Sequence, residues 1–402
     1  MKRMNILVFN CGSATLKFQL IETDSASVFS SRDRKLAHGL VERIGADARY
    51  RFEAGDHETA KVLPIRDHDA AVRAVLEWLG SIPALPRPAA VGHRVVHGGD
   101  RYVSATLIDA ATVATLDGLN DIAPLHNPAA VSGIRAARQA LGDSVPMVAV
   151  FDTAFHHTIP EAAATYALPY ELAEKHKIRR YGFHGVAHQY DVARYAQLNG
   201  KEAAEVNGVI LHLGNGCSAS AIRNGQSVET SMGFTPLEGL VMGTRSGDVD
   251  AALVGYLARK EGVEATTVES WLNKRSGLLG ISGLSNDMRE LIAARDVNRR
   301  ARLAVEVFCH RARKYLGAYL AVLGGAEAVI FSGGIGENAP SVRQEICRNM
   351  EWCGLKLDAG ANAARLGQDG CISSAASALA IWVIHTDEEA IIARQTAQTV
   401  GG

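Results

Sequence analysis

One local pattern occurs twice in the chain, at a constant offset of 204 residues. Residues 6–15 and residues 210–219 each contain a strand-like apolar run, a glycine turn and a run of alternating residues. The second copy closes at Asn224-Gly225, a dipeptide typical of tight β-hairpins. A duplicated chain folds into two similar lobes, each opened by a hairpin, with a cleft between them. Any two buried strands that end in glycine look alike, so the pattern by itself leaves duplication and coincidence about equally open.

Short apolar runs alternate with longer amphipathic segments along the whole chain. The aliphatic runs are typical of buried strands, which we expect at residues 5–9, 90–91 with 95–96, 146–151, 208–213 and 328–331. The segments with helical periodicity predict helices at residues 69–79, 129–141, 188–197 and 300–323. The 402 residues are enough for two or three domains, so the pattern predicts an α/β protein built of packed lobes.

Charge and cysteine content exclude several classes of protein. Lysine and arginine number 42 and aspartate and glutamate 43, so the net charge of −1 argues against nucleic acid or an anionic membrane surface as a partner. The six cysteines form no CxxC pair, which predicts neither a zinc site nor a disulfide framework. No apolar run reaches the roughly 18 residues of a membrane span. We therefore expect a cytoplasmic protein.

Glycine turns follow three of the expected strands. The phosphate-loop pattern GxxxxGK[ST] is absent, but GxGxxA occurs at 214/216/219 and again at 334/336/339. The first match is followed by a second strand, whereas the second runs from a strand toward a helix after Pro340. A backbone cradle for a phosphate or a nucleotide fits these turns, and a tight turn without a ligand explains them about as well.

Several polar side chains stand among the glycines. The turn at residues 10–17 can surround phosphate oxygens with donors, while Asn10 offers an oxygen toward a metal; the alternative is an ordinary hairpin with polar tips. The segments 92–99, 181–185 and 242–248 each place an arginine or a histidine among glycines, where it can approach an anion. One such segment would be a surface salt bridge, but three together indicate an anion site. Asp152 follows the expected strand 146–151, where open α/β sheets place functional residues.

Nine segments of the chain, in order, carry a family resemblance: NCGSATLKF from Asn10, VGHRVVHGG from Val91, APLHNP from Ala123, VFDTAFHHTIP from Val150, YGFHG from Tyr181, HLGNG from His212, TSMGFTPLEGLVMGTRSGD from Thr230, SGGIGEN from Ser332 and TDEE from Thr386. With these segments the chain resembles the acetate kinase family over nearly its full length. The resemblance implies two duplicated ribonuclease-H-like lobes of the actin-like ATPase kind with a nucleotide cleft between them, and a homodimer. Residues 1–152 with 386–402 would form the N-terminal lobe on the acyl and phosphate side, and residues 153–385 the C-terminal lobe for nucleotide binding and dimerisation.

The family pattern implies a role for each matching position. Asn10 and Glu388 are implied to be associated with the metal. Near the nucleotide phosphates it places Lys17, Ser13 and Thr15. The catalytic positions are Arg94, which holds the substrate carboxylate, Asp152, His184 and Arg245. The acyl pocket matches Val96, Leu125, Phe183 and Pro236. The nucleotide contacts are His212, Leu213, Gly214, Asn215, Gly216, Asp287, Met288, Arg289, Gly334, Ile335, Gly336, Glu337 and Asn338.

The chain departs from the usual family pattern at four places: Ala14-Thr15 in place of serines, Val186-Ala187 in place of Thr-Ser, Ser332-Gly333 in place of Thr-Ala, and His385 in place of proline. Thr15 keeps a hydroxyl for phosphate contact. Val186 and Ala187 remove two hydroxyls that could support His184. The last two departures suggest altered loop stiffness.

The function implied is ATP-dependent phosphorylation of acetate to acetyl phosphate and ADP, reversible, with Mg²⁺ or alternatively Mn²⁺. A carboxylic acid is ionised at pH 7, so no general base is required and the main obstacle is repulsion between two anions. Positive charge and positioning overcome it, and we expect Asp152 to orient Arg94 or metal-bound water. The alternatives are a kinase for propionate or another short-chain carboxylate, and an actin-like or chaperone-like ATPase.

Overall fold

The computed structural model describes residues 3–12, 14–24, 33–121 and 127–401. The chain divides into two compact units, one made of Met1–His157 with Asp387–Gly402 and the other of Thr158–Thr386. Within the described ranges, no helix has both the length and the apolar composition needed to cross a bilayer.

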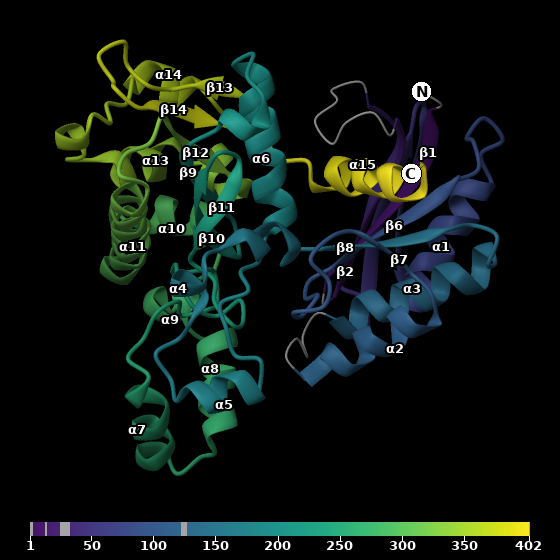
Figure 1. The fold of residues 1–402 in the computed structure, drawn as a ribbon, viewed down its shortest axis with the longest axis horizontal. Helices are drawn as coiled ribbons and strands as arrows, with labels where there is room; N and C mark the ends of the chain where they lie inside the picture. Colours follow the sequence, from purple (N-terminus) through teal and green to yellow (C-terminus); the bar gives the residue numbers. More distant parts are fainter. Residues whose placement is uncertain (1–2, 13, 25–32, 122–126, 402) are drawn as a thin grey trace. The chain divides into compact units, whose positions relative to one another are not determined.

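Unit 1 is built on an eight-stranded sheet with the order β5-β4-β3-β2-β1-β6-β8-β7 (Figure 1). Strand β1 pairs antiparallel with β2 and parallel with β6, which in turn pairs parallel with β8. The strands are β1 Met4–Cys11, β2 Thr15–Thr23, β3 Arg34–Glu42, β4 Asp47–Ala54, β5 His57–Pro64, β6 Ala90–Val95, β7 Thr106–Leu107 and β8 Met147–Phe151. The parallel strands β1, β6 and β8 end at the same edge of the sheet, which is where this unit gathers its polar side chains.

Helices cover both faces of this sheet (Figure 1). They are α1 His68–Gly80, α2 Ala110–Gly118, α3 Asn127–Leu141 and α15 Glu388–Gly401. Helix α1 begins after Asp67, whose side chain accepts a hydrogen bond from Ala70 N at 2.8 Å. On the other face α15 lies against Gly92 of β6. A Cβ at Gly92 would come within 2.4 Å of Thr396 Oγ1 on this helix. The absent side chain thus allows α15 to approach the sheet.

Unit 2 is built on a six-stranded sheet with the order β11-β10-β9-β12-β14-β13. Its strands are β9 Gly208–Leu213, β10 Cys217–Arg223, β11 Gln226–Thr230, β12 Ala328–Ser332, β13 Gly370–Cys371 and β14 Ala380–Val383. The turn between β10 and β11 has φ of 52° at Asn224 and 74° at Gly225, the left-handed pair that a two-residue hairpin requires.

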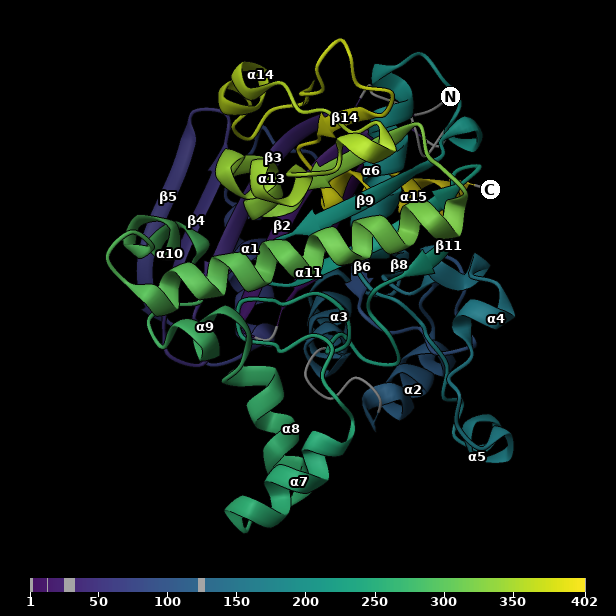
Figure 2. The ribbon, with the colours of Figure 1, turned by 90° about the vertical axis from the view of Figure 1, so that its left-hand side faces the viewer.

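The main helices of unit 2 are α6 Gly185–Leu198 and α11 Arg299–Leu323, and α11 runs across the sheet in Figure 2. Asn298 caps α11 by accepting from Ala301 N at 3.1 Å. The other helices are α4 Glu161–Ala164, α5 Tyr170–Lys175, α7 Ala252–Glu261, α8 Ala265–Lys274, α9 Gly277–Ser282, α10 Met288–Ala294, α12 Gly333–Asn338, α13 Pro340–Cys347 and α14 Ala359–Ala364. Between β11 and α7 the chain forms a long loop without regular structure, and this loop carries Arg245.

The two sheets share one topology. In each, an antiparallel three-strand meander continues into two parallel strands, β3-β2-β1-β6-β8 in unit 1 and β11-β10-β9-β12-β14 in unit 2. The repeat in the sequence begins at the first strand of each meander, β1 and β9. The expected strands and helices are all present, and the predicted α/β fold of two duplicated lobes is confirmed.

Candidate active site

Four polar residues of unit 1 form a cluster at the carboxyl edge of the parallel strands. Asn10 lies near the end of β1, Arg94 near the end of β6, Asp152 directly after β8, and Glu388 at the start of α15. Arg94 donates two parallel hydrogen bonds to Asp152, from Nε to Oδ1 at 2.8 Å and from Nη2 to Oδ2 at 2.6 Å. Its third nitrogen, Nη1, donates to Asn10 Oδ1 at 3.0 Å and lies 3.6 Å from Glu388 Oε2. Arg94 is therefore fixed in position by carboxylates on two sides.

The electrostatics of this cluster follow from its burial. Burial disfavours the Arg94 cation, but the carboxylates of Asp152 and Glu388 outweigh it and raise the pKa of Arg94. Burial raises the pKa of Glu389, the residue after Glu388, and the neighbouring Glu388 raises it further. Asn10 Nδ2 donates to both carboxylates, at 3.1 Å to Glu388 Oε2 and at 3.0 Å to Glu389 Oε1. The amide of Asn10 thus joins the arginine to the two glutamates.

The donor set in this cluster fits a hard divalent cation. Asn10, Asp152 and Glu388 can each supply a side-chain oxygen, and two adjacent glutamates concentrate negative charge that a cation would offset. In the described part of the chain, no group of three or more His, Cys, Asp or Glu side chains could enclose a metal by itself. Mg²⁺ is commonly bound in this way, by one or two carboxylates together with water and substrate phosphates.

The remaining candidates of unit 1 are partly accounted for. Lys17 is exposed on β2, and Thr15 Oγ1 lies 2.5 Å from the position that a Cβ on Gly12 would take. The ring of His68 donates from Nε2 to Gly12 O at 2.7 Å, which steadies the glycine turn. Val96 is buried, with 8% of its surface exposed. Two further candidates lie outside the described residues: Ser13 and Leu125.

Three of the predicted residues in unit 2 meet around Gly216. A Cβ on Gly216 would lie 2.8 Å from Arg245 Nη2 and 3.2 Å from His184 Nε2. A Cβ on Gly243 would lie 1.9 Å from Asn215 Oδ1, so this glycine makes room for the Asn215 side chain. His184 adopts a left-handed backbone conformation, with φ of 59°, directly before α6. Such strain in a residue other than glycine is common at functional sites.

Arg245 differs from Arg94 in its partners. Its Nη1 donates to Pro236 O at 2.7 Å. Within the described ranges, no carboxylate lies within ion-pair distance of Arg245. Burial lowers the pKa of Arg245. Its cation is therefore held in place without being neutralised, which suits it to bind an anion.

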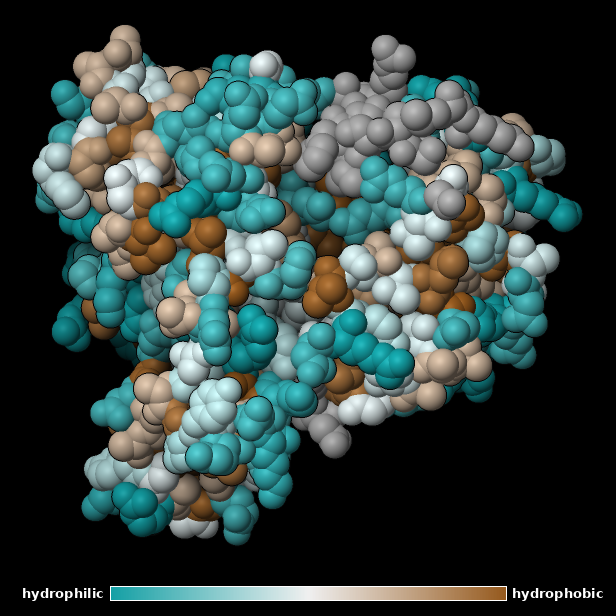
Figure 3. All heavy atoms as spheres, in the orientation of Figure 1, coloured by the Kyte–Doolittle hydropathy of each residue, from teal (hydrophilic) through white to brown (hydrophobic). Residues whose placement is uncertain are grey.

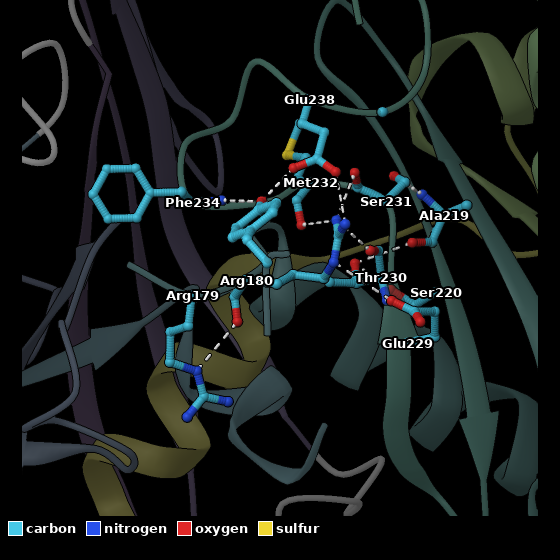
Figure 4. A network of polar contacts seen from close by, with 12 residues as sticks. Arg179, Arg180, Ala219, Ser220, Glu229, Thr230, Ser231, Met232, Phe234 and Glu238 are labelled. Atoms are coloured by element: carbon cyan, nitrogen blue, oxygen red, sulfur yellow. Dashed lines mark hydrogen bonds and ion pairs between the residues drawn. The ribbon is translucent and has the colours of Figure 1, made fainter. Parts of the chain in front are cut away.

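A partly buried clamp joins the segment before His184 to the loop that carries Arg245 (Figure 4). Arg180 Nη2 donates to Glu238 Oε1 at 2.6 Å, and Nη1 donates to Thr230 O at 3.0 Å. Tyr166 donates its hydroxyl to the other oxygen of Glu238. Burial opposes the Arg180 cation, but Glu238 raises the pKa of Arg180 overall. The clamp fixes the ends of the two segments that bring His184 and Arg245 together.

A cavity of about 740 Å³ lies beside the Gly216 region, within unit 2. It is lined by Gly214, Asn215, Asn286, Asp287, Met288, Arg289, Ile292, Gly334, Ile335, Asn338, Ala339, Pro340 and Ser341. Met288, Ile292 and Ile335 supply apolar surface suited to a flat ring, and the glycines expose backbone N–H groups. Glu337 does not line this cavity, because its carboxylate accepts from His385 Nδ1 at 2.7 Å.

Comparison with known proteins assigns the family. The pattern of the acetokinase family matches residues 5–394. An acetate kinase of Solibacter usitatus (strain Ellin6076) is 51% identical over 409 residues, which cover 99% of each chain. The crystal structure of Porphyromonas gingivalis acetate kinase matches with a TM-score of 0.90 and 38% identity, over 99% of this chain and 100% of that one. A propionate kinase from Francisella tularensis subsp. tularensis SCHU S4 matches with a TM-score of 0.89 and 40% identity, over 98% and 99% of the two chains.

The chain belongs to the acetokinase family. Membership confirms the resemblance inferred from the motifs and the prediction of an ATP-dependent phosphotransferase. Within each unit of this acetokinase, the structure brings together residues that the motifs named separately. Unit 1 groups Asn10, Arg94, Asp152 and Glu388, and unit 2 groups His184, Asn215 and Arg245. Of the acyl-pocket residues, Val96 falls in unit 1, whereas Phe183 and Pro236 fall in unit 2.

Several residues beside the candidate site have no local sequence signal. Glu389 follows Glu388, but its contact with Asn10 joins residues 379 positions apart. Ser218 places its Oγ 3.0 Å from His184 Nδ1, so a strand hydroxyl supports His184 although Val186 and Ala187 have none. Gly333 has φ of 72°, so this departure from the family pattern supplies a left-handed backbone conformation that glycine adopts readily.

Proposed function

We propose that this acetokinase transfers the γ-phosphoryl group of ATP to acetate, reversibly and by direct in-line displacement, to give acetyl phosphate and ADP. The observation that carries the proposal is the pair formed by His184 and Arg245 over Gly216, where two nitrogen-bearing side chains converge and no carboxylate of the described residues neutralises Arg245. Such a pair suits the spread negative charge of a phosphoryl group in transit. The curated relatives named acetate kinase support acetate as the acceptor.

Phosphoryl transfer to acetate requires that the substrates be held in position, and it requires no proton abstraction. Acetate is already an anion at pH 7, so Asp152 is not required as a base. Its two bonds to Arg94 instead fix the guanidinium, whose cation then receives the substrate carboxylate. His184 and Arg245 stabilise the charge that develops on the transferring group, and the nucleotide occupies the cavity lined by Asp287, Gly334 and their neighbours.

Mg²⁺ is the metal that the donor set suits best, with Mn²⁺ as a substitute. Glu388 and Asn10 would hold it, with Asp152 beside them. When bound, the ion neutralises phosphate charge.

A second candidate substrate is propionate, because the similar Francisella protein is a propionate kinase. The two acids differ by one methylene, which a small apolar pocket discriminates by about 1–3 kcal/mol. The described residues that the family pattern assigns to the acyl group are Val96 in unit 1 and Phe183 and Pro236 in unit 2. We expect acetate to be preferred and propionate to be accepted.

We further propose that the enzyme is a cytoplasmic homodimer. All six cysteines are free thiols, as suits a reducing compartment. Helix α7 has no buried residue, and its Leu253 and Tyr256 are 41% and 49% exposed. Figure 3 shows brown side chains intermixed with teal ones over the part of unit 2 that contains α5, α7 and α8. A second copy of the chain would cover such side chains.

A hydroxylamine trap tests the proposed function. Acyl phosphates react with hydroxylamine to give hydroxamates, so acetate, ATP and Mg²⁺ should give acetohydroxamate at a rate that falls when EDTA is added. Omission of acetate is the control. ATP hydrolysis without hydroxamate would indicate an ATPase instead, and hydroxamate formation unchanged by EDTA would contradict the metal requirement.

A further inference from the structure

Two buried groups lie behind the imidazole of His184. The Oγ of Ser218, on β10, lies 3.0 Å from His184 Nδ1 and 2.7 Å from Nε2 of His188. His188 is one turn further along α6 than His184, and its N–H donates to His184 O at 2.9 Å. Neither Ser218 nor His188 is exposed to solvent. One strand hydroxyl therefore bridges two imidazole rings in the interior of unit 2.

The two nitrogens of His184 face opposite surroundings. Nδ1 is at Ser218, whereas Nε2 points to the space over Gly216, where Arg245 Nη2 also lies. A ring held by a hydrogen bond at Nδ1 has a fixed plane, so the direction of Nε2 is fixed as well. The hydrogen bond with Ser218 thus fixes the direction of His184 Nε2, the nitrogen that faces the proposed phosphoryl site.

The hydroxyl also links the protons of the two rings. A serine hydroxyl has one hydrogen, so Ser218 donates to one ring and accepts an N–H from the other. When His184 is a cation, its Nδ1–H donates to Ser218, and Ser218 donates to His188. When His184 is neutral with its proton on Nε2, His188 donates to Ser218, and Ser218 donates to His184. These two arrangements leave an N–H on Nε2, directed at the space beside Arg245, whereas a neutral His184 with its proton on Nδ1 would leave Nε2 as an acceptor.

A parallel arrangement supports a second histidine. His212 Nδ1 lies 3.0 Å from Ser332 Oγ, and Ser332 donates to Asp191 Oδ2 at 2.5 Å. Because the one hydrogen of Ser332 is donated to Asp191, Ser332 can only accept from the ring, and His212 donates from Nδ1. The buried face of α6 thus places His188 in contact with Ser218 and Asp191 in contact with Ser332.

We propose that Ser218 and His188 are positioning residues that hold the Nε2–H of His184 toward the transferring phosphoryl group. The inference rests on the proposed function. Groups that orient a site residue through one hydrogen bond typically change activity by about 10- to 100-fold when removed. Because Ser218 acts on the reaction only through His184, its effect should vanish when His184 is absent.

A double-mutant cycle tests this dependence. Ser218→Ala should lower kcat for hydroxamate formation by about 10- to 100-fold, with the KM values for acetate and ATP changed by less than about twofold. In a His184→Ala background, the same substitution should change kcat by less than about twofold. Ser220→Ala is the matched control, because Ser220 is equally buried on the same strand and contacts Thr230 Oγ1 at 3.1 Å instead of a histidine.

Two substitutions at His188 provide an independent arm. Glutamine can place an amide near the position of the ring Nε2, so His188→Gln should retain most of the activity, whereas His188→Leu should lose as much as Ser218→Ala. Equal kcat values for Ser218→Ala and Ser220→Ala, or equal losses in both backgrounds of the cycle, would overturn the positioning role. A wild-type enzyme that forms no hydroxamate would instead reject the proposed function on which the role depends.

Discussion

The two site arginines are held in opposite ways. In unit 1, Arg94 is gripped by Asp152 through two bonds, with Glu388 on its other side, and its pKa is raised. In unit 2, Arg245 donates to one backbone carbonyl among the described residues, that of Pro236, and burial lowers its pKa. A neutralised cation provides a fixed docking point, whereas an unneutralised one retains its field for charge that appears during the reaction. This difference in partners is the basis on which we propose substrate binding for Arg94 and phosphoryl stabilisation for Arg245.

The largest effect should come from removing the unneutralised cation. Arg245→Ala should lower kcat by roughly 10³-fold or more, with a smaller change in KM, because charge on the phosphoryl group develops beyond the ground state. His184→Ala should also act mainly on kcat, by about 10²- to 10³-fold. Arg223→Ala is the control, since Arg223 also donates to a backbone carbonyl, that of Val322, without facing the site. A near-normal kcat for Arg245→Ala would make Arg245 a structural residue.

Removing the neutralised cation should affect stability and substrate binding together. Arg94→Ala leaves Asp152, which is 1% exposed, without its main partner, and should lower the free energy of unfolding by about 3 kcal/mol or more. The KM for acetate should rise strongly. Adding Asp152→Asn should restore much of the stability but not the KM, as measured by urea unfolding and steady-state kinetics. If Arg245→Ala destabilised the protein as much as Arg94→Ala, the contrast between the two arginines would be wrong.

The clamp of Figure 4 offers an indirect test of the role proposed for Arg245. Glu238 lies on the loop that carries Arg245, and Glu238→Gln removes the negative charge to which Arg180 donates. The substitution should lower kcat by about 10-fold, because Arg245 would be misplaced. Glu229→Gln is the matched control, because Glu229 lies 3.6 Å from the same guanidinium but belongs to β11 rather than to the loop. Similar kcat values for the two variants would separate the clamp from catalysis.

Strand β6 places a buried residue without polar partners among the described residues, His93, next to Arg94, whose charge is neutralised. His93, beside Arg94, is buried, and within the described ranges neither ring nitrogen has a hydrogen-bond partner. Burial, with a smaller contribution from Arg138, lowers its pKa to about 3.

Between about pH 6.5 and that value the unfolded chain binds the proton and the folded chain does not. This group should therefore reduce stability by about 1.4 kcal/mol for each unit that pH falls below 6.5, with no effect above it. His93→Leu should flatten this dependence in urea unfolding at pH 5.0 to 7.5. An unchanged slope would show that His93 does not cause it.

The smallest expected effect concerns chain length of the acid. Val96→Ala should enlarge the acyl pocket and raise kcat/KM for propionate relative to acetate by a few-fold, within the ~10- to 200-fold range that one methylene commands. The control is the melting temperature of the same variant, because Val96 is largely buried. An unchanged substrate ratio with a lowered melting temperature would place Val96 in the core rather than in the pocket.

Local features of the sequence were sufficient to predict the framework. Buried strands require apolar runs, and the Asn224-Gly225 turn requires residues that accept positive φ, so β1, β6, β8, β9 and β12 could be predicted from short segments. The motifs likewise named Arg94, His184 and Arg245, because three separate segments place an arginine or a histidine among glycines, and Asp152, because it follows a buried strand.

What each of those side chains does was decided only by the tertiary structure. Arg94 and Asp152 are 58 positions apart, and Asn10 and Glu389 are 379 apart, so no local pattern indicates that they bond. Nor does any local pattern indicate that Ser218 lies behind His184, or that Arg245 has a carbonyl for a partner where Arg94 has carboxylates. Residue type sets which bonds a side chain can make, but the charge and direction that it presents depend on which distant groups the fold brings within about 3 Å of it.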